Sequence, residues 1–297
     1  MPTKASTQST IELIHKYQIH FRKDLGQNFL IDDNILRKIV ESAEVTNEDY
    51  VLEIGPGIGN LTRHLAEAAN HVASVEIDPF LIPILKETMS PYTNVSIIHN
   101  NILKMDLNDF LMREAKDRPV KVVANLPYYI TTPILMGLLE KKVPIQSITV
   151  MIQEEVARRI QSAPGTKEYG ALSLAVAYYA TPHIVMTVSP NCFIPRPKVS
   201  SSVLRLDCLT KPSVEVTDED FFFSVIRAAF NQRRKTLCNA LSKSAFIDIP
   251  KEKVVQALQK MELSETIRGE VLTIKEFAQL SQYLRDTLPL KRTSANA

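Results

Sequence analysis

Short apolar runs alternate with amphipathic segments over roughly the first 180 residues of the chain. Runs of this kind are typical of parallel strands buried on both faces, and the stretches between them carry helical periodicity. The runs lie near residues 51–54, 72–77, 95–99, 121–124 and 147–152. Two more runs, 183–188 and 202–207, follow without a helix between them and predict a hairpin. The pattern therefore predicts an open α/β fold with seven strands.

The pattern changes after Lys211-Pro-Ser213, where only helical periodicity remains. Thr217-Asp-Glu-Asp220 is typical of a helix start, because its acidic residues suit the positive end of the helix dipole. We therefore predict two domains, a sheet domain over residues 1–210 and a small all-helical domain over residues 211–297.

Three of the 8 glycines of the chain fall within Gly55-Pro-Gly57-Ile-Gly59, directly after the first predicted strand. Such a cluster predicts a tight turn that a ligand approaches closely. The next strand ends near Glu76, which is placed to accept hydrogen bonds from ribose hydroxyls. The spacing does not match the Gly-x-Gly-x-x-Gly of dinucleotide sites, and the acidic Glu53 disfavours phosphate. S-adenosylmethionine, which is cationic and carries no phosphate, fits both observations.

Asn125-Leu-Pro-Tyr128 follows the fourth predicted strand, at the edge where open α/β sheets bind ligands. The Asn125 side-chain oxygen and the Leu126 carbonyl oxygen are two acceptors that would draw the lone pair of an adenine amine out of the ring. Pro127 fixes the backbone, and Tyr128 offers a face on which a base stacks. The same residues also fit a plain strand end and proline turn with Tyr128 in the core.

Five motifs together closely resemble the KsgA-type family of small-subunit ribosomal RNA adenine N6-dimethyltransferases, and they keep the family order from about residue 15 to about residue 285. The resemblance implies a Rossmann-like S-adenosylmethionine-dependent catalytic domain and a helical domain that contacts RNA or the ribosome. It also implies dimethylation of two adjacent adenosines in the 3′-terminal hairpin of 16S ribosomal RNA, in the 30S subunit or its precursor. The motifs are Gly26-Gln-Asn-Phe-Leu30, Glu53-Ile-Gly-Pro-Gly-Ile-Gly59, Glu76-Ile-Asp78, Asn125-Leu-Pro-Tyr128 and Phe193-Ile-Pro-Arg-Pro-Lys-Val199.

Carried over to this sequence, the family pattern gives a cofactor set and a catalytic set. An amino-terminal segment closes over the cofactor, Gly55 approaches its methionine part, Glu76 binds its ribose, and Asn125 lies between the cofactor and the target amine. The implied cofactor residues are Asn28, Leu30, Gly55, Gly57, Glu76, Ile77, Asn101, Ile102 and Asn125. The implied catalytic residues are Asn125, Leu126, Pro127, Tyr128 and Phe193.

One position departs from the family pattern, because Asn100-Asn-Ile102 stands where an acidic residue usually precedes a small apolar one. Asn101 still offers an oxygen to the adenine amino group of the cofactor, but without charge. Charge-assisted hydrogen bonds are roughly twice as strong as neutral ones, so we expect weaker cofactor binding.

Phe193 precedes Ile-Pro195-Arg-Pro197, where alternating prolines favour an extended loop. The resemblance implies that this loop holds the Phe193 ring opposite Tyr128, so that an extruded base lies between the two rings. From the residues alone, a phenylalanine near a loop is more often a core anchor.

The net charge of +2 is too small to indicate nucleic-acid binding, so local clusters carry that expectation. Residues 221–244 contain five basic side chains and no acidic one, and helical spacing places Arg227, Asn231 and Arg234 on one face. With RNA as the implied substrate, we expect basic clusters to contact phosphates. The expected RNA-binding residues are Arg22, Lys23, Arg196, Lys198, Arg227, Arg233, Arg234 and Lys235.

The composition, with 45% hydrophobic and 23% charged residues, is that of an ordinary globular protein. No apolar stretch is long enough to span a bilayer, no signal-peptide pattern opens the chain, and the three scattered cysteines suit a reducing compartment. We therefore expect a cytoplasmic protein, and in the absence of apolar heptads a monomer. No histidine or cysteine cluster has the spacing of metal ligands, so we expect no metal.

Three other functions remain compatible with the motifs. An erythromycin-resistance type of methylase shares the fold but modifies large-subunit RNA, and the loop from Phe193 to Val199 favours the small-subunit substrate. DNA adenine methylases generally carry an acidic residue at the position of Asn125. A ribosome-assembly factor with secondary methylation activity would bind small-subunit precursors independently of catalysis.

Overall fold

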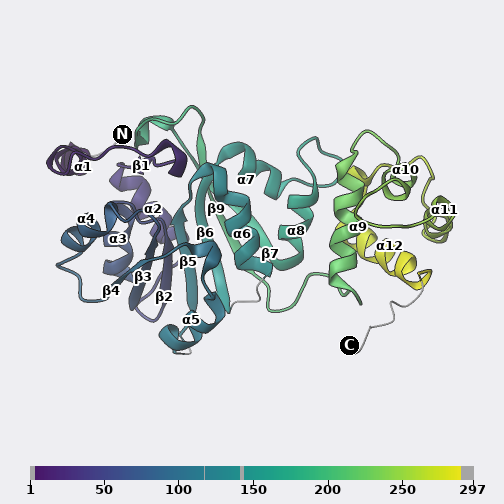
Figure 1. The fold of residues 1–297 in the computed structure, drawn as a ribbon, viewed down its shortest axis with the longest axis horizontal. Coiled ribbons are helices and arrows are strands. Elements are labelled where there is room, and N and C mark those ends of the chain that lie inside the picture. The colour runs from purple at the N-terminus through teal and green to yellow at the C-terminus, as the bar shows by residue number, and fades with distance from the viewer. Residues whose placement is uncertain (1–3, 117, 141–143, 289–297) are drawn as a thin grey trace, which may run out of the picture. The chain divides into compact units, whose positions relative to one another are not determined.

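The computed structural model describes residues 4–116, 118–140 and 144–288, with side chains described for these residues except 4–9 and 23. The chain forms two compact units (Figure 1). The first unit contains Met1–Arg158 and Tyr179–Thr210, and the second contains Arg159–Tyr178 and Lys211–Ala297.

The first unit contains a seven-stranded sheet with the strand order β4-β3-β2-β5-β6-β9-β7. Neighbouring strands from β4 to β6 are parallel, whereas β9 runs antiparallel to both β6 and β7. The seven predicted strands and the closing antiparallel pair are therefore confirmed. The strands are β2 (Tyr50–Ile54), β3 (His71–Glu76), β4 (Val95–His99), β5 (Val120–Asn125), β6 (Ile145–Gln153), β7 (Ala180–Val188) and β9 (Ser201–Cys208).

Helices connect the parallel strands, and their apolar faces are buried against the sheet. Leu36 of α2 and Leu65 of α3 pack in one cluster with Val51 of β2 and Val72 of β3. The helix α3 begins at Asn60, as the glycine turn predicts. The helices of this unit are α1 (Lys4–Lys16), α2 (Asp33–Ser42), α3 (Asn60–Ala68), α4 (Leu81–Thr88), α5 (Leu107–Ala115) and α6 (Thr131–Glu140), and α7 (Glu154–Gln161) also begins in it.

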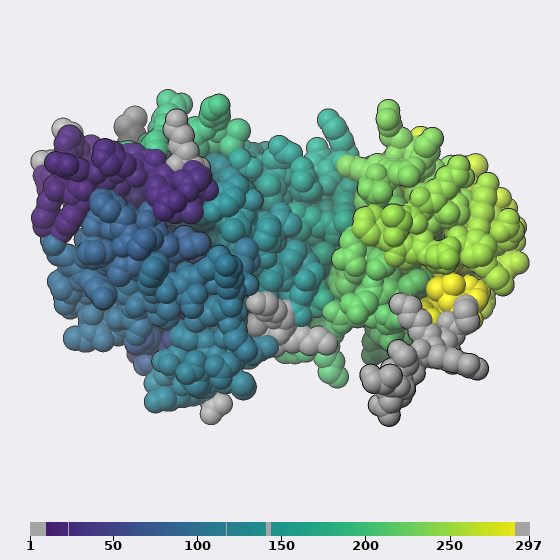
Figure 2. Space-filling view, viewed as in Figure 1, coloured from purple at the N-terminus to yellow at the C-terminus, as the bar shows by residue number. Residues whose placement is uncertain are grey.

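The amino-terminal segment lies against residues of the same unit that come later in the chain (Figure 2). The Asn60 side-chain amide donates to Thr10 Oγ1 at 3.1 Å, and Lys16 and Tyr17 both bond the Glu87 carboxylate. The strand β1 (Phe29–Leu30) then pairs antiparallel with β8 (Phe193–Ile194). These contacts hold the segment over the edge of the sheet where β2 and β3 end.

The second unit is helical around a core that includes the fully buried Phe222 and Phe277. Asp218 caps α9 by accepting a hydrogen bond from the Phe221 N–H, as its acidic start predicts. Thr273 and Glu276 form a capping box at α12. The helices are α8 (Ala171–Tyr179), α9 (Glu219–Asn231), α10 (Leu237–Ser242), α11 (Lys251–Lys260) and α12 (Ile274–Asp286).

Two sequence-based expectations about this unit are corrected. Residues 159–178 were expected in the first domain but pack with the helical unit, where the Tyr169 hydroxyl donates to the Leu272 carbonyl at 2.8 Å. Arg234 was expected on one face of a continuous helix, but α9 ends at Asn231. The backbone leaves the helical region at Gln232, with a φ of −127° and a ψ of 59°, and Thr236 then caps a new helix, its side chain accepting from the Asn239 N–H.

Candidate active site

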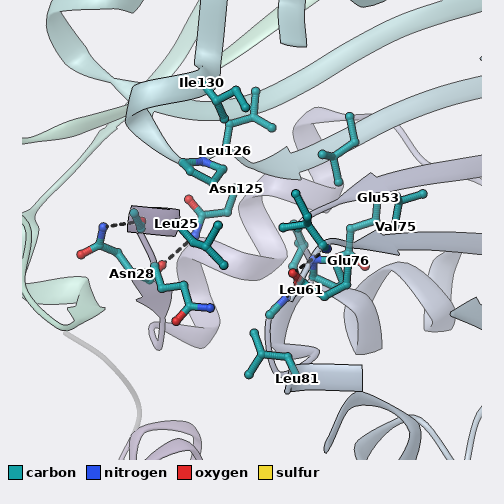
Figure 3. A pocket seen from close by; sticks show the side chains of 18 of the residues that line it. Leu25, Asn28, Glu53, Leu61, Val75, Glu76, Leu81, Asn125, Leu126 and Ile130 are labelled. Carbon is teal, nitrogen blue, oxygen red and sulfur yellow. Dashed lines mark hydrogen bonds between the residues drawn. The ribbon is translucent and has the colours of Figure 1, made fainter. Parts of the chain in front are cut away.

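A cavity lies at the carboxyl ends of β3, β2 and β5, three parallel strands that are neighbours in the sheet (Figure 3). Its empty volume is about 1120 Å³, including the part that is open to solvent. All the expected cofactor residues line it, together with Leu126, Pro127 and Tyr128. The sheet topology therefore brings together residues that are up to about a hundred positions apart in the sequence.

The glycine loop after β2 forms one wall of the cavity. Gly55, Gly57 and Gly59 have positive φ values of 68°, 61° and 91°, which side-chain-bearing residues rarely adopt. A Cβ at Gly57 would lie 3.0 Å from the Phe29 ring, so this position also requires close packing. A Cβ at Gly55 would meet nothing within 4 Å. The loop thus leaves open space beside Gly55 where a ligand fits.

Glu76 is held at the end of β3 by three backbone N–H groups. Its Oε1 accepts from Ile77 and Asp78, each at 2.9 Å, and its Oε2 accepts from Gly57 at 3.1 Å. Burial raises the pKa of this carboxyl, while the three backbone hydrogen bonds oppose that shift. Because each carboxylate oxygen has more than one acceptor site, Oε2 can still receive a hydroxyl hydrogen.

Glu53 also lines the cavity, but only 1% of its surface is exposed. Burial raises its pKa to about 7, with a smaller contribution from the Glu76 carboxylate, although the Ser74 hydroxyl donates to it at 2.7 Å. A substantial fraction of Glu53 is therefore protonated at neutral pH. Its negative charge at neutral pH is therefore partial, and its acceptor atoms remain suited to an ammonium group.

The Asn125 amide has a defined orientation. Its Nδ2 donates to the Asn28 carbonyl oxygen at 3.1 Å (Figure 3). Since a carbonyl oxygen only accepts, the nitrogen must face Asn28, and Asn125 Oδ1 remains as an acceptor. Leu126 donates its N–H to the Met151 carbonyl at 3.1 Å, and its own carbonyl accepts no hydrogen bond from the described residues. The two acceptors expected from the sequence are thus available together.

Two tyrosines follow these acceptors. The Tyr128 hydroxyl lies 2.7 Å from Ser201 Oγ, and burial raises the pKa of this half-buried phenol. Tyr129 also lines the cavity but is 57% exposed. Sequence analysis missed Tyr129, although its position next to a predicted stacking residue was the available signal.

The amino-terminal segment closes the opposite wall. Gly26 has a φ of 60°, and a Cβ there would lie 3.2 Å from the Tyr129 ring and 3.4 Å from Pro127. The Asn60 side chain donates to the Leu30 carbonyl at 2.8 Å. The sequence did not predict this contact, because no local signal links the amino-terminal motif that contains Leu30 to the residue that follows the glycine loop. Together these contacts hold Asn28 and Leu30 at the wall of the cavity.

The remaining residues that were expected to bind the cofactor, Ile77, Asn101 and Ile102, come from the loops after β3 and β4. Asn101 Oδ1 accepts from the Leu103 N–H at 3.0 Å and caps the short 3-10 helix Ile102–Lys104. One lone pair of that oxygen is therefore already used, and the second remains available as an acceptor.

Phe193 differs from its expected position. It is only 3% exposed, pairs with Leu30 across β1 and β8, and packs in the core cluster behind the sheet edge. It is not among the residues that line the cavity. This burial fits the alternative drawn from the residues alone, a phenylalanine that anchors the core, rather than a ring that faces Tyr128 across a base.

The expected RNA-binding residues divide between the two units. In the first unit Arg22, Arg196 and Lys198 are exposed, and the side chain of Lys23 lies outside the described residues. In the second unit Arg227, Arg233, Arg234 and Lys235 are exposed. Arg233 is engaged within its own unit, donating to the Lys167 carbonyl at 2.8 Å and lying 3.4 Å from Glu270.

Within the described ranges no group of histidine, cysteine or acidic side chains has the arrangement of a metal site. Among the helices of the same ranges, none is long and apolar enough to cross a membrane.

The architecture is that of the S-adenosylmethionine-dependent methyltransferases. A crystal structure of a dimethyladenosine transferase from Plasmodium falciparum matches with a TM-score of 0.71 and 26% identity, covering 83% of this chain and 94% of that one. A crystal structure of the 23S rRNA methyltransferase ErmE matches with a TM-score of 0.65 and 28% identity, covering 86% and 99%.

The sequence comparisons are more specific. The family model for ribosomal RNA adenine dimethylase matches residues 18–286. Ribosomal RNA small subunit methyltransferase A of Lachnoclostridium phytofermentans is 54% identical over 282 residues, covering 95% of this chain and 97% of the relative. The protein of the same name from Clostridium botulinum strain Loch Maree is 49% identical over 280 residues, covering 94% and 100%. The chain therefore belongs to the ribosomal RNA adenine dimethylase family, as the motifs predict, and is an adenine dimethyltransferase.

Proposed function

We propose that this enzyme uses S-adenosylmethionine to dimethylate the N6 amines of two adjacent adenosines in the 3′-terminal hairpin of 16S ribosomal RNA, within the small subunit or its precursor. The observation that carries the proposal is the pair of acceptors at Asn125 Oδ1 and the Leu126 carbonyl. Both lie in a cavity whose glycine wall leaves room for a second ligand.

The donor set fits S-adenosylmethionine, which supplies a methyl group already activated on a sulfonium. Glu76 would accept from the ribose hydroxyls, and Asn101 from the adenine amino group. The open space at Gly55 would receive the methionine part, near the acceptor oxygens of Glu53. Asn28, Leu30, Gly57, Ile77 and Ile102 would form the surrounding walls.

The target adenosine would be held by the chain's own groups. Asn125 Oδ1 and the Leu126 carbonyl would accept the two amine hydrogens and orient the nitrogen lone pair away from the ring. Alignment of two reactants in this way supplies roughly 7–11 kcal/mol of barrier reduction in favourable cases. Pro127 would hold the loop in shape and Tyr128 would stack on the base. Phe193 would act from the core, by supporting β1 and Leu30.

Contact with the rest of the RNA would come from exposed basic residues. In the first unit these are Arg22, Arg196 and Lys198, and in the helical unit they are Arg227, Arg233, Arg234 and Lys235. Lys23, whose side chain lies outside the described residues, would join the first group. Neutralised phosphates release counterions, so binding through these residues would weaken as salt rises. The protein would act in this way as a monomer during small-subunit biogenesis.

The test is to incubate the purified protein with labelled S-adenosylmethionine and small subunits that lack the modification, and then to locate the modified nucleotides. We expect four methyl groups for each particle, two on each of two adjacent adenosines in the 3′-terminal hairpin. A parallel reaction contains large-subunit RNA in place of the small subunits. Label in that RNA, with none in the small subunits, would overturn the proposal in favour of the 23S rRNA substrate named for ErmE.

A further inference from the structure

A second hollow adjoins the cavity and shares the Gly26–Asn28 segment with it. Its empty volume is about 960 Å³, including the part open to solvent. The segment before Gly26 lines it on one side, and Pro195, from the loop after β8, lines it as well. Apart from the RNA contact expected of Arg22, the roles described above assign no ligand to this hollow.

The side chains of the second hollow combine rings with a cation. His20 and Pro195 are exposed, while Phe21 is partly buried and fixed against the Phe29 ring, with 5.5 Å between the ring centroids. Arg22 also lines the hollow. Flat rings beside a guanidinium are the usual platform for single-stranded nucleic acid, because bases stack on the rings and phosphate pairs with the cation.

The Arg22 guanidinium has acidic neighbours that a phosphate would have to compete with. It lies 2.6 Å from Asp24 and 3.9 Å from the buried Asp78. The side chains of Arg22 and Asp24 are 47% and 63% exposed. Exposed pairs of this kind contribute little free energy, so a phosphodiester can take over the guanidinium.

The wall that the two hollows share lies beside the position where the target amine would sit. The Asn28 carbonyl, in the shared segment, accepts from Asn125 Nδ2, and Tyr129 packs against Gly26 in the same segment. The second hollow is therefore adjacent to the place proposed for the target base, on the other side of the shared segment.

We propose that the second hollow binds the nucleotide next to the target adenosine, with its base against His20 and Pro195 and its phosphate at Arg22. This inference rests on the proposed function and extends it, because it assigns a place to one of the two adjacent adenosines while the other is methylated. A site for the neighbouring base would also favour a particular sequence around the target.

A double-mutant cycle, which combines a protein variant with an altered RNA, tests the subsite. The kcat/KM for methyl transfer is measured for wild type and His20→Ala, each with intact small-subunit particles and with particles reconstituted from RNA that carries an abasic nucleotide on either side of one target adenosine. Removing the ring or the base should each lower kcat/KM about tenfold, the effect of losing one stacked base. If the His20 ring and one neighbouring base stack on each other, removing both should lower kcat/KM no more than removing either one, about tenfold. This should hold for only one of the two nucleotides that flank the target adenosine.

Losses that multiply to about a hundredfold at both neighbours, or a His20→Ala variant with wild-type kcat/KM, would overturn the subsite. Arg22→Ala should in addition lower the salt slope of RNA binding by about one. Arg113→Ala is the matched control, because Arg113 is an exposed arginine paired with Asp109 on α5 and lines neither hollow. Thermal melting checks that each variant is folded. Failure of wild type to methylate intact particles would instead refute the proposed function.

Discussion

The cavity of the first unit and the basic turn of residues 233–235 in the second unit were both expected to carry function, but they are built differently. The cavity gathers residues from distant parts of the chain. There the Glu76 carboxylate accepts a hydrogen bond from the Gly57 N–H, and the Asn125 amide donates one to the Asn28 carbonyl. The basic turn is a run of sequence neighbours with exposed side chains. The comparison teaches that the order of the strands determines the positions of the functional side chains at the cavity. In the basic turn, only the local backbone determines the positions of the charged side chains.

The largest expected effect is at Asn125, because the proposed function depends most on the acceptor that its side chain provides. Asn125→Ala removes one acceptor for the target amine and the hydrogen bond to the Asn28 carbonyl. Removing a single preorganised hydrogen-bonding group from an active site typically costs about 10²–10³ in rate. We expect a fall of that size in the single-turnover rate of methyl transfer to small subunits.

Asn70→Ala is the matched control, because Asn70 also donates to a backbone carbonyl, that of Asn47, but lies outside the cavity. It should keep the wild-type rate. An Asn125→Ala rate within about threefold of wild type would mean that the two acceptors do not orient the amine.

Glu53 tests how a buried carboxyl differs from the exposed charges of the basic turn, because its burial makes the stability of the protein depend on pH. Burial raises its pKa from 4.5 to about 7, so between these values the folded protein keeps a proton that the unfolded chain has lost. Its favourable contribution to stability is therefore complete below about pH 4.5 and is lost as the pH rises through 7. Glu53→Gln stays neutral, so relative to wild type it should gain roughly 2–3 kcal/mol between pH 5 and pH 8.

Denaturant unfolding of the cofactor-free protein at both pH values measures this difference. Glu48→Gln, at an exposed position, is the control and should show no such change. An equal stability difference at pH 5 and pH 8 would show that Glu53 is ionised at both, as a fixed negative charge.

Much of the cavity was predictable because its parts have local signatures. Continuous apolar runs predict the strands, and the cluster at Gly55–Gly59 predicts a turn that requires positive φ. Parallel strands then place Glu76 and Asn125 at one edge without further information. The family pattern supplied the segment that holds Asn28, which no local signal connects to the sheet.

Other parts were not predictable, because long-range pairing decides them. Phe193 lies in a proline-rich stretch that reads as a loop, yet it pairs with Leu30 and is buried in the core. Residues 159–178 continue the strand–helix pattern, yet contacts such as Tyr169 with Leu272 place them in the helical unit. At the end of α9, the backbone leaves the helical region at Gln232, which removes Arg234 from the expected face.

The basic turn gives a smaller expected effect. Arg233 is engaged with Lys167 and Glu270, whereas no ion pair is recorded for Arg234 or Lys235 among the described residues. The double variant Arg234→Ala/Lys235→Ala should therefore lower the salt slope of small-subunit binding by about two, one for each phosphate contact. Arg233→Ala should change the slope less and the stability of the helical unit more.

Binding titrations between about 50 and 200 mM salt measure these slopes, the range over which phosphate contacts have large effects. Lys275→Ala, an exposed basic residue on α12, is the control. Equal slopes for wild type and the double variant would mean that the basic turn is solvated surface and contacts no phosphate. Of the two regions compared, only the cavity would then carry function.

The smallest expected effect lies inside the cavity, at the position where this chain departs from its family. Asn101→Asp keeps the oxygen that accepts from the Leu103 N–H and adds a negative charge at the cavity, where we propose that the cofactor adenine binds. A charge-assisted hydrogen bond is roughly twice as strong as a neutral one, so we expect the Kd for S-adenosylmethionine to fall severalfold. Calorimetric titration measures it, with Asn108→Asp on α5 as the control for added charge. An unchanged Kd would show that the Asn101 oxygen serves only the Leu103 cap, and that the adenine is held by the walls of the cavity alone.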